Sequence, residues 1–486
     1  MFAHSPDDYT ETSSVRRREI PLRGKGRRIL FGFGFWALGC SIGFGLASSW
    51  GPSWGGSGSQ MQDCVAHFDS PRPVLEGEAP HVVTEPPGGG RPITQTLLKG
   101  PPTAAFRDNL QPDVQYITTW PGSGWTNDVL LYMNLLYFAM ITERVPVIPY
   151  FTPTHVGKGN APTLPFGEVF DIPRIENATG LRILEWHQVK DSESEVVDTL
   201  GCWSIWKAVQ SFNTEPHFTS APGRLKLDVS YTTAPRWIKM DSNDQNAFAT
   251  FWTIASLAFP ETRARNLQAP TLSPIRSVAL PPDEHMVCYD YLYYVGTYTD
   301  YEWESDFSPA WRFVGRHMHW TPQLQQLAER YTREALGLAS YQATPPYIAV
   351  HVRRGDFANW CNNVPINDCF PSFDVIERRV EEVKGEIYSK KRIRVDRVIV
   401  TSDEEDPAWW AEVAKLGWSN PDHSRTADVH GKWYPLLIDA VIQSSAIGFV
   451  GTDRSTVSVI ARKRIQTWNS GISRTVKWGS PGADDH

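Results

Sequence analysis

The chain has 486 residues, which is enough for two globular domains of ordinary size. Aromatic residues make up 12% of it and include 20 Trp, a composition typical of packed cores and sugar-facing surfaces rather than of disorder. The formal net charge of −7 argues against a nucleic-acid partner, because proteins that bind nucleic acids usually present a basic face.

The N-terminus pairs a basic segment with an apolar one. Residues 1–28 carry seven Lys and Arg, whereas residues 29–50 carry no charge and are long enough to cross a bilayer as a helix. Basic residues ahead of such a segment favour a cytoplasmic N-terminus, so we expect 1–28 to be a cytoplasmic tail and 29–50 a transmembrane signal anchor. The protein would be a single-pass type II membrane protein of the Golgi or endoplasmic reticulum. A cleaved secretory signal is the alternative, and it would also lead to the lumen.

The region after the anchor reads first as a linker and then as a folded domain. Residues 51–112 are rich in Gly, Pro and Ser and are expected to form a flexible stem. Residues 114–119 and 145–150 then read as strands, with a Gly-rich turn and an apolar helix (127–142) between them. This order is typical of a βαβ unit. No regular order is visible from 180 to 310.

The C-terminal half alternates between apolar strands and helices. Strands are expected at 347–353, 397–401 and 446–450, and helices at 324–338, 373–390, 407–416, 433–444 and 456–468. Repeated βα units imply a mostly parallel sheet covered by helices. We therefore predict an α/β protein with two Rossmann-like domains, residues 113–320 and 321–486, that face a cleft. Ligands of such sheets bind outside the carboxyl ends of the strands.

The cysteines suggest two disulfides in an oxidising lumen. Cys361 and Cys369 flank a loop rich in Asn, Pro and Asp, so a local bridge is expected between them. Cys202 with Cys288 would form a second bridge, which leaves Cys64 in the stem. Free buried thiols are the alternative. Neither a Cys/His cluster with zinc spacing nor an Asp-x-Asp motif is present, so no metal or other cofactor is predicted.

The segment His-Val-Arg-Arg-Gly-Asp-Phe (351–357) runs off the end of a predicted strand. Its first Arg, Arg353, shares one strand face with His351, because side chains alternate along a strand. A guanidinium there can grip a diphosphate with two parallel hydrogen bonds and stabilise the charge that develops on a leaving group. We therefore predict Arg353 as a catalytic residue. Its neighbour Arg354 is either a second contact or the partner of Asp356 in a structural ion pair.

Polar residues follow other predicted strands as well. Asn127 and Asp128 end the Gly-rich turn before the first helix, where they are either catalytic or helix caps. Ser455 and Thr456 open the last helix, where their hydroxyls and the helix amides can hold a phosphate, or Ser455 can be an ordinary N-cap. Asp403 ends a further strand and is either a nucleobase or ribose contact or a loop carboxylate.

Together these segments resemble a known family. Residues 351–357 resemble the His-x-Arg-Arg-x-Asp-Phe segment of the GDP-fucose protein O-fucosyltransferases and their plant and fungal relatives. Residues 123–128, 401–403 and 451–457 resemble, respectively, the family's Gly-Gly-x-Asn-Gln turn, Ala-Thr-Asp strand end and Gly-Thr-x-x-Ser-Thr-Phe segment. The resemblance spans about residues 113–470, although the irregular middle adds little to it. Four segments in the same order are fairly specific.

The resemblance implies a GT-B fold and an inverting transfer of fucose from GDP-fucose to a protein or glycan acceptor, without a metal. The N-terminal domain would take the acceptor and the C-terminal domain the GDP-sugar. The implied site consists of Arg353 on the β-phosphate and glycosidic oxygen, Asn127 beside the diphosphate, Ser455 and Thr456 on phosphate, Asp403 near the guanosine, and His351 and Asp356 in support.

The chain departs from the family pattern in two places. Asp128 stands where the family has Gln, and Val457 stands where it has Phe. Some relatives carry a Glu near the first segment as the general base, and this chain has none at Ser123 or Gly124. We therefore expect Asp128 or Asp356 to take that role, or the site to work without a strong base. Two alternatives stay open: a GT-B transferase with another nucleotide-sugar, and a non-catalytic luminal glycan-binding protein.

Overall fold

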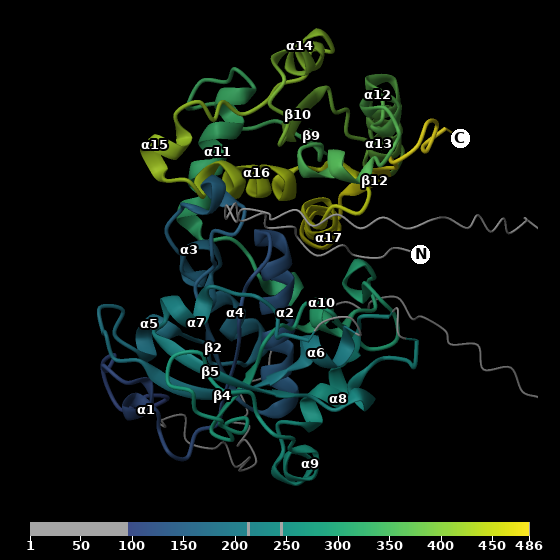
Figure 1. Cartoon of the computed structure of the whole chain (residues 1–486). Coiled ribbons are helices and arrows are strands. Elements are labelled where there is room, and N and C mark those ends of the chain that lie inside the picture. The colour runs from purple at the N-terminus through teal and green to yellow at the C-terminus, as the bar shows by residue number, and fades with distance from the viewer. Residues whose placement is uncertain (1–95, 211–213, 244–245, 486) are drawn as a thin grey trace, which may run out of the picture. The chain divides into compact units, whose positions relative to one another are not determined.

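A computed structural model describes residues 96–210, 214–243 and 246–485 (Figure 1). These residues belong to one compact unit of the chain, Ile93–His486. The predicted cytoplasmic tail and signal anchor, Cys64 and most of the predicted stem lie outside the described residues. In the described part of the chain, no helix is both long enough and apolar enough to cross a membrane.

The first sheet has six strands in the order β3-β2-β1-β7-β4-β5, and its paired strands all run parallel. Its strands are β1 (Tyr116–Thr119), β2 (Val145–Ile148), β3 (Leu184–Glu185), β4 (Asp198–Ser204), β5 (Leu227–Thr233) and β7 (Met286–Tyr289). Tyr289 is level with Thr119 of β1 and with Trp203 of β4. The carboxyl ends of these three neighbouring strands therefore meet at one edge of the sheet.

The predicted βαβ unit is confirmed as β1, α2 (Trp125–Thr142) and β2. Nearly every side chain of α2 is buried, which explains why its sequence is apolar all round rather than on one face. A small parallel sheet pairs β6 (Ala249–Thr250) with β8 (Val295–Gly296). The remaining helices of this part are α1 (Phe106–Asn109), η1 (Val156–Gly159), α3 (Phe166–Val169), α4 (Ile172–Thr179), α5 (Trp186–Val189), α6 (Ile205–Val209), α7 (Ala221–Arg224), η2 (Arg236–Ile238), α8 (Phe251–Ser256), α9 (Pro260–Asn266), η3 (Glu302–Glu304), α10 (Pro309–Phe313) and η4 (Gly315–His317).

The second sheet has four parallel strands in the order β10-β9-β11-β12. They are β9 (Tyr347–Val352), β10 (Arg397–Ser402), β11 (Gly448–Thr452) and β12 (Ile472–Val476). The helices of this part are α11 (Pro322–Ala335), η5 (Asp356–Trp360), α12 (Ile366–Cys369), α13 (Phe373–Lys391), α14 (Pro407–Lys415), α15 (Thr426–His430), α16 (Tyr434–Ser445) and α17 (Thr456–Asn469). The strands and helices predicted in this half are thus confirmed, and the α/β class with parallel sheets is correct.

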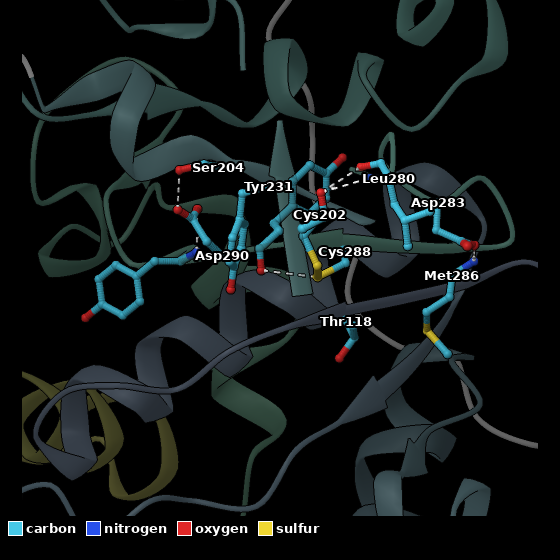
Figure 2. The surroundings of a disulfide bond; sticks show 12 residues. Thr118, Cys202, Ser204, Tyr231, Leu280, Asp283, Met286, Cys288 and Asp290 are labelled. Atoms are coloured by element: carbon cyan, nitrogen blue, oxygen red, sulfur yellow. Dashed lines mark hydrogen bonds between the residues drawn. A yellow bond between two sulfur atoms is a disulfide. The ribbon is translucent and has the colours of Figure 1, made fainter. Parts of the chain in front are cut away.

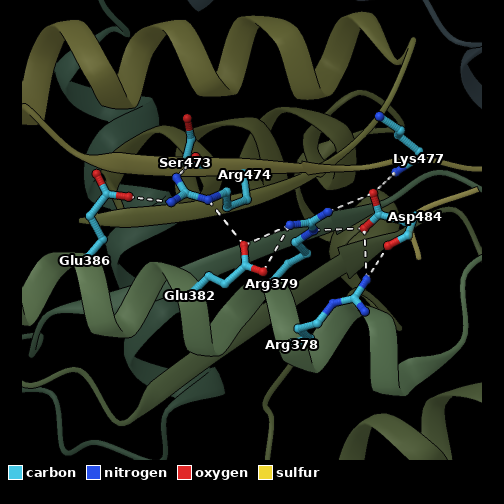
Figure 3. A network of polar contacts seen from close by, with 8 residues as sticks. All are labelled: Arg378, Arg379, Glu382, Glu386, Ser473, Arg474, Lys477 and Asp484. Carbon is cyan, nitrogen blue, oxygen red and sulfur yellow. Dashed lines mark hydrogen bonds and ion pairs between the residues drawn. The ribbon is translucent and has the colours of Figure 1, made fainter. Parts of the chain in front are cut away.

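Ion pairs fasten α13 to the end of the chain (Figure 3). Arg379 of α13 contacts Glu382 on its own helix and the almost fully buried carboxylate of Asp484. Arg474 of β12 contacts Glu382 and Glu386 of the same helix. The network holds the outer strand β12 and the C-terminal segment against α13.

One hydrophobic core runs through both sheets. The same cluster of buried side chains contains Ile117 from β1, Leu131 from α2, Ala349 from β9 and Phe449 from β11. The two sheets therefore share one core, and each sheet has a further cluster of buried side chains of its own. The predicted division at residue 320 and the predicted cleft between two domains stay predictions.

The predicted stem extends too far along the chain. Phe106 and Leu110 are almost fully buried, and the Phe106 ring packs edge-on against Trp186 with 5.5 Å between ring centroids. The Tyr116 hydroxyl donates to the Leu97 carbonyl. Residues 96–112 thus belong to the fold, because Phe106 and Leu110 of this Pro-rich segment pack into the core. The overall composition of the segment does not reveal two such buried side chains.

Both predicted disulfides are confirmed. Cys202–Cys288 joins β4 to β7 across the middle of the first sheet (Figure 2). Cys361–Cys369 closes the loop that follows β9.

The region 180–310, where the sequence shows no regular order, supplies β3, β4, β5 and β7 of the first sheet. Gly201 of β4 shows why the pattern is hard to read. A side chain there would collide with the Pro281 carbonyl oxygen, so the strand needs a glycine where an apolar residue would be expected.

Candidate functional site

The carboxyl end of β9 holds the segment that the sequence singles out. His351 lies within β9 and is buried, and its Nδ1 is 2.8 Å from the Ser458 hydroxyl. Burial, with a smaller effect of the Arg353 charge, lowers the pKa of His351 to about 3. The imidazole is therefore neutral at physiological pH. Because His351 is buried and bonded to Ser458 of α17, we assign it a role in holding the end of β9 in place.

Arg353 stands at the strand end with its guanidinium between two carboxylates. Nη2 is 2.7 Å from Asp356 Oδ1, and Nη1 is 3.0 Å from Asp403 Oδ2. Its backbone N–H donates to the Thr452 hydroxyl at 2.9 Å. The Arg353 side chain keeps 30% of its exposure, so it is both oriented and accessible. The two carboxylates thus fix the direction of the guanidinium and leave further N–H groups for a ligand.

Arg354 takes the structural alternative, with a different partner from the one expected. Its Nε forms an ion pair with Glu404 Oε2 at 2.5 Å, not with Asp356. Its backbone N–H donates to Asp403 Oδ1 at 2.8 Å, so one carboxylate binds both arginines of the segment. A Cβ at Gly355 would lie 2.5 Å from Asp403 Oδ2, which explains the glycine after the two arginines.

The turn between β11 and α17 holds a buried residue, Ser455, whose hydroxyl the helix itself does not use. Ser455 occupies the N-cap position of α17, yet its side chain makes no capping hydrogen bond. The residue before it, Arg454, has a φ of 62°, a left-handed conformation uncommon outside Gly. The Ser455 hydroxyl and the first amides of α17 share one end of the helix, where anions are favoured.

The Gly-rich loop before α2 is organised by Asp128. This carboxyl group is fully buried, and Oδ1 accepts hydrogen bonds of 3.1 Å from the backbone N–H groups of Gly122 and Ser123. Burial raises the pKa of Asp128 well above its usual range. Asn127 next to it is partly exposed, and its side-chain amide makes no hydrogen bond to a described residue.

A hydrogen bond joins the first turns of two helices, one from each sheet's part of the chain. The Thr126 hydroxyl in α2 lies 2.8 Å from the Thr456 hydroxyl in α17. Thr452 at the end of β11 bonds Arg353 and the His351 carbonyl. The structure thus brings Arg353, Asp356 and Asp403 into direct contact and places Ser455 and Thr456 on the adjoining turn, with Asn127 and Asp128 beside Thr126.

Sequence reasoning missed three of the residues that build this junction. Thr452, Glu404 and Thr126 are ordinary Ser/Thr/Glu positions at element ends, and only their contacts reveal their roles. Their one common signal is position, because each lies within a few residues of a predicted strand or helix end.

Across the described ranges, no group of three or more His, Cys, Asp or Glu side chains is arranged to hold a metal ion.

Comparison with solved structures finds similar chains among the structures of fucosyltransferases. A POFUT1 structure in complex with GDP-fucose is 15% identical over 76% of this chain and 99% of that chain, with a TM-score of 0.48. A POFUT1 structure in complex with GDP is 17% identical over 74% and 98% of the two chains, also with a TM-score of 0.48. NodZ fucosyltransferase from Bradyrhizobium is 13% identical over 72% and 92%, with a TM-score of 0.36.

A comparison with curated proteins finds no match. The family comparison does find one. The model of a family described as GDP-fucose protein O-fucosyltransferase matches residues 116–466, which include the first sheet, every strand of the second sheet except β12, and the junction described above. Because this match covers well over half of the chain, the protein belongs to the GDP-fucose protein O-fucosyltransferase family.

Proposed function

We propose that this protein transfers fucose from GDP-fucose to a hydroxyl group of a protein or glycan acceptor, with inversion at the sugar carbon and without a metal ion. Membership of the family supports the choice of donor. The observation that carries the proposal is Arg353, which two carboxylates orient at the carboxyl end of β9, beside the end of β11.

In the proposed reaction, negative charge develops on the β-phosphate oxygen as its bond to the sugar carbon breaks. Arg353 uses one contact on each terminal nitrogen for Asp356 and Asp403, so further N–H groups remain for phosphate oxygens. The α17 N-terminus with Ser455 faces a second phosphate group in this proposal. A guanidinium held in place before the reaction lowers the barrier, because it need not reorganise as charge develops.

The buried carboxyl of Asp128 suggests a positioning role in place of the predicted base. Its Oδ1 is occupied by the loop amides, and burial favours the protonated form, which cannot accept a proton. Asp356 is exposed but paired with Arg353. We therefore propose that both residues shape the site and that the proton acceptor lies elsewhere.

We also propose the predicted location, a type II membrane protein with its folded part in the lumen of the Golgi or endoplasmic reticulum. The charge-free segment 29–50 behind a basic tail supports an anchor. The two disulfides within the fold support an oxidising compartment. Protease protection of a C-terminal tag in sealed microsomes tests this location, and a tag digested without detergent would contradict it.

The activity is tested with the full-length chain by measuring GDP release from GDP-fucose with and without EDTA. Arg353→Ala should lower turnover by about 100- to 1,000-fold, because it removes one preorganised donor to the leaving group. Arg353→Lys should not restore it, since an ammonium cannot form the two-pronged contact. Arg333→Ala, which removes a pair with Glu329 on α11, is the matched control and should keep wild-type turnover.

Two outcomes would replace the proposal. Turnover of another nucleotide-sugar, with none of GDP-fucose, would favour a different GT-B transferase. Binding of glycans with no binding of any nucleotide-sugar would favour a non-catalytic protein of the same fold. Loss of turnover in EDTA that added Mg²⁺ or Mn²⁺ restores would contradict the metal-independent part.

A further inference from the structure

A second polar cluster lies at the carboxyl end of the six-stranded sheet. Its anchor is Asp290, the residue directly after β7, which is fully buried. Asp290 accepts hydrogen bonds from the Ser204 hydroxyl at 2.6 Å and the Ile205 N–H at 2.7 Å, at the end of β4 (Figure 2). It also accepts from the backbone N–H groups of Tyr291 and His217. One carboxylate thus ties β7, β4 and the segment around residue 217 together.

His217 is pressed against the Gly-rich loop from this side. Its ring stacks on Tyr291 with 3.7 Å between centroids and an angle of 2° between planes. The Tyr291 hydroxyl lies 2.7 Å from the Ser123 hydroxyl. A Cβ at Gly122 would lie 3.1 Å from His217 Cε1, so the glycine permits this close approach. The Thr219 hydroxyl donates to the Pro121 carbonyl and fixes the same segment to the start of the loop.

One ring nitrogen of His217, the buried Nδ1, has no hydrogen-bond partner in the described part of the chain. Burial lowers the pKa of His217 to about 4, and a hydrogen bond with the Phe218 backbone offsets a smaller part of that shift. The ring is therefore neutral at physiological pH and keeps a lone pair. A buried polar group without a partner is rare in proteins and is often found where a ligand or a reaction uses it.

The cluster around His217 is linked to the contact between the two sheets' helices through the Gly-rich loop. The loop that touches His217 leads within a few residues to Thr126, whose hydroxyl contacts Thr456 at the start of α17. The proposed donor site occupies the carboxyl ends of β9, β10 and β11. The cluster at β1, β4 and β7 occupies the corresponding edge of the other sheet, where ligands of parallel sheets also bind.

We propose that His217 accepts the proton of the acceptor hydroxyl in the transfer reaction proposed above, on which this inference rests. The acceptor oxygen forms a bond to fucose C1 while the bond from C1 to the β-phosphate oxygen breaks. The electron pair of that bond leaves with GDP, and the proton of the hydroxyl moves to the unprotonated ring nitrogen of His217. The ring already stacks on the face of Tyr291, which fixes its orientation during the transfer.

An imidazole that is neutral at physiological pH can accept a proton, as a Glu carboxylate does in glycosyl chemistry. In some relatives the general base is a Glu in the Gly-rich turn. We propose that His217 takes this role here, because it comes from another segment but lies against the same turn at Gly122.

The test uses the full-length chain, with GDP release from GDP-fucose as the rate and GDP titration as the measure of donor binding. His217→Ala should lower the rate by about 100-fold or more and leave the GDP affinity within about twofold. Imidazole added to the buffer should restore part of the lost rate, because it can occupy the space of the missing ring. A merely structural role would not respond to imidazole. His217→Gln, which fills the space, should be slow and should not be rescued.

His155→Ala is the matched control. This exposed residue contacts the same loop, with Cδ2 3.5 Å from a Cβ placed on Gly124, and its replacement should leave the rate unchanged. A normal rate in His217→Ala, or a low rate that imidazole does not restore in either His217 variant, overturns the inference. If Arg353→Ala abolishes turnover while His217→Ala retains it, only this inference fails. If the wild type neither binds GDP nor turns over GDP-fucose, the proposed function fails and the inference falls with it.

Discussion

Arg353 is oriented by groups from two neighbouring strands. Thr452 of β11 holds its backbone, and Asp403 after β10 holds one side of its guanidinium. A long side chain that is already ordered loses less conformational entropy when it binds a ligand. The contribution of Arg353 to the proposed reaction therefore depends on residues that lie about 50 and 100 positions further along the chain.

Ser455 offers a test of the proposed phosphate site at the residue scale. Ser455 is buried, but its hydroxyl makes no capping bond, so Ser455→Ala should cost less than the loss of an ordinary helix cap, which is about 1 kcal/mol. If the hydroxyl binds a charged phosphate, the loss should be about 1.5–3 kcal/mol of GDP binding, which is roughly 10- to 150-fold in affinity. Urea denaturation and GDP titration measure the two effects.

Thr321→Ala is the control for this prediction, because the opposite pattern is expected. Thr321 is the N-cap of α11, and its hydroxyl does accept from the Leu324 N–H. Its loss should cost about 1 kcal/mol of stability and no GDP affinity. An unstable Ser455→Ala with normal GDP binding would show that Ser455 serves the fold and not the donor.

At the scale of elements, the loop after β9 carries aromatic rings beside the guanidinium. Phe357 stacks on Trp360 and Trp478, with centroid distances of 5.2 Å and 4.8 Å. Arg353 Cζ lies 5.7 Å from the Phe357 centroid. The Cys361–Cys369 bridge packs into the same small cluster. This bridge therefore holds the surroundings of Arg353, whereas Cys202–Cys288 holds the first sheet.

Removing each bridge in turn should affect the free energy of unfolding and the GDP affinity to different extents. In the loop-entropy model, replacing Cys202 and Cys288 by Ala costs about 4.5 kcal/mol, because the bridge spans 86 positions. Replacing Cys361 and Cys369 costs about 2.5 kcal/mol, because that bridge spans only 8. We expect the second pair to lose more GDP affinity despite its smaller stability loss. Equal losses of GDP affinity in the folded fraction of both variants would contradict this.

At the scale of the whole molecule, buried neutral histidines make stability depend on pH. His319 stacks on Trp468 with 4.1 Å between centroids, and burial together with Arg174 and Arg464 lowers its pKa from 6.5 to about 4. The unfolded chain binds the proton more readily, so this group costs stability as pH falls from about 6.5 to about 4. The raised pKa of Asp290, about 6, acts in the opposite direction, favouring the fold below that pH.

A single variant isolates the histidine contribution. His319→Asn removes the ring and its packing at every pH, but it also removes the group that takes up a proton on unfolding. The stability difference between wild type and variant should therefore be largest near pH 7.5 and should narrow toward pH 4.5. Denaturant unfolding at several pH values measures it. A difference that stays constant or widens at low pH would contradict the assignment.

The sequence by itself determined the βα alternation of the C-terminal half, the first βαβ unit, both disulfides and the segments that meet at the junction. These features have local signals, namely side-chain periodicity, turn residues and Cys spacing. The structure alone decided that residues 96–112 join the fold, that β4, β5 and β7 complete the first sheet, and that Arg354 pairs with Glu404. It also decided that Asp128 faces the loop and that His217 lies against Gly122. These contacts join residues far apart in the chain, and such pairs leave no periodic pattern in the sequence.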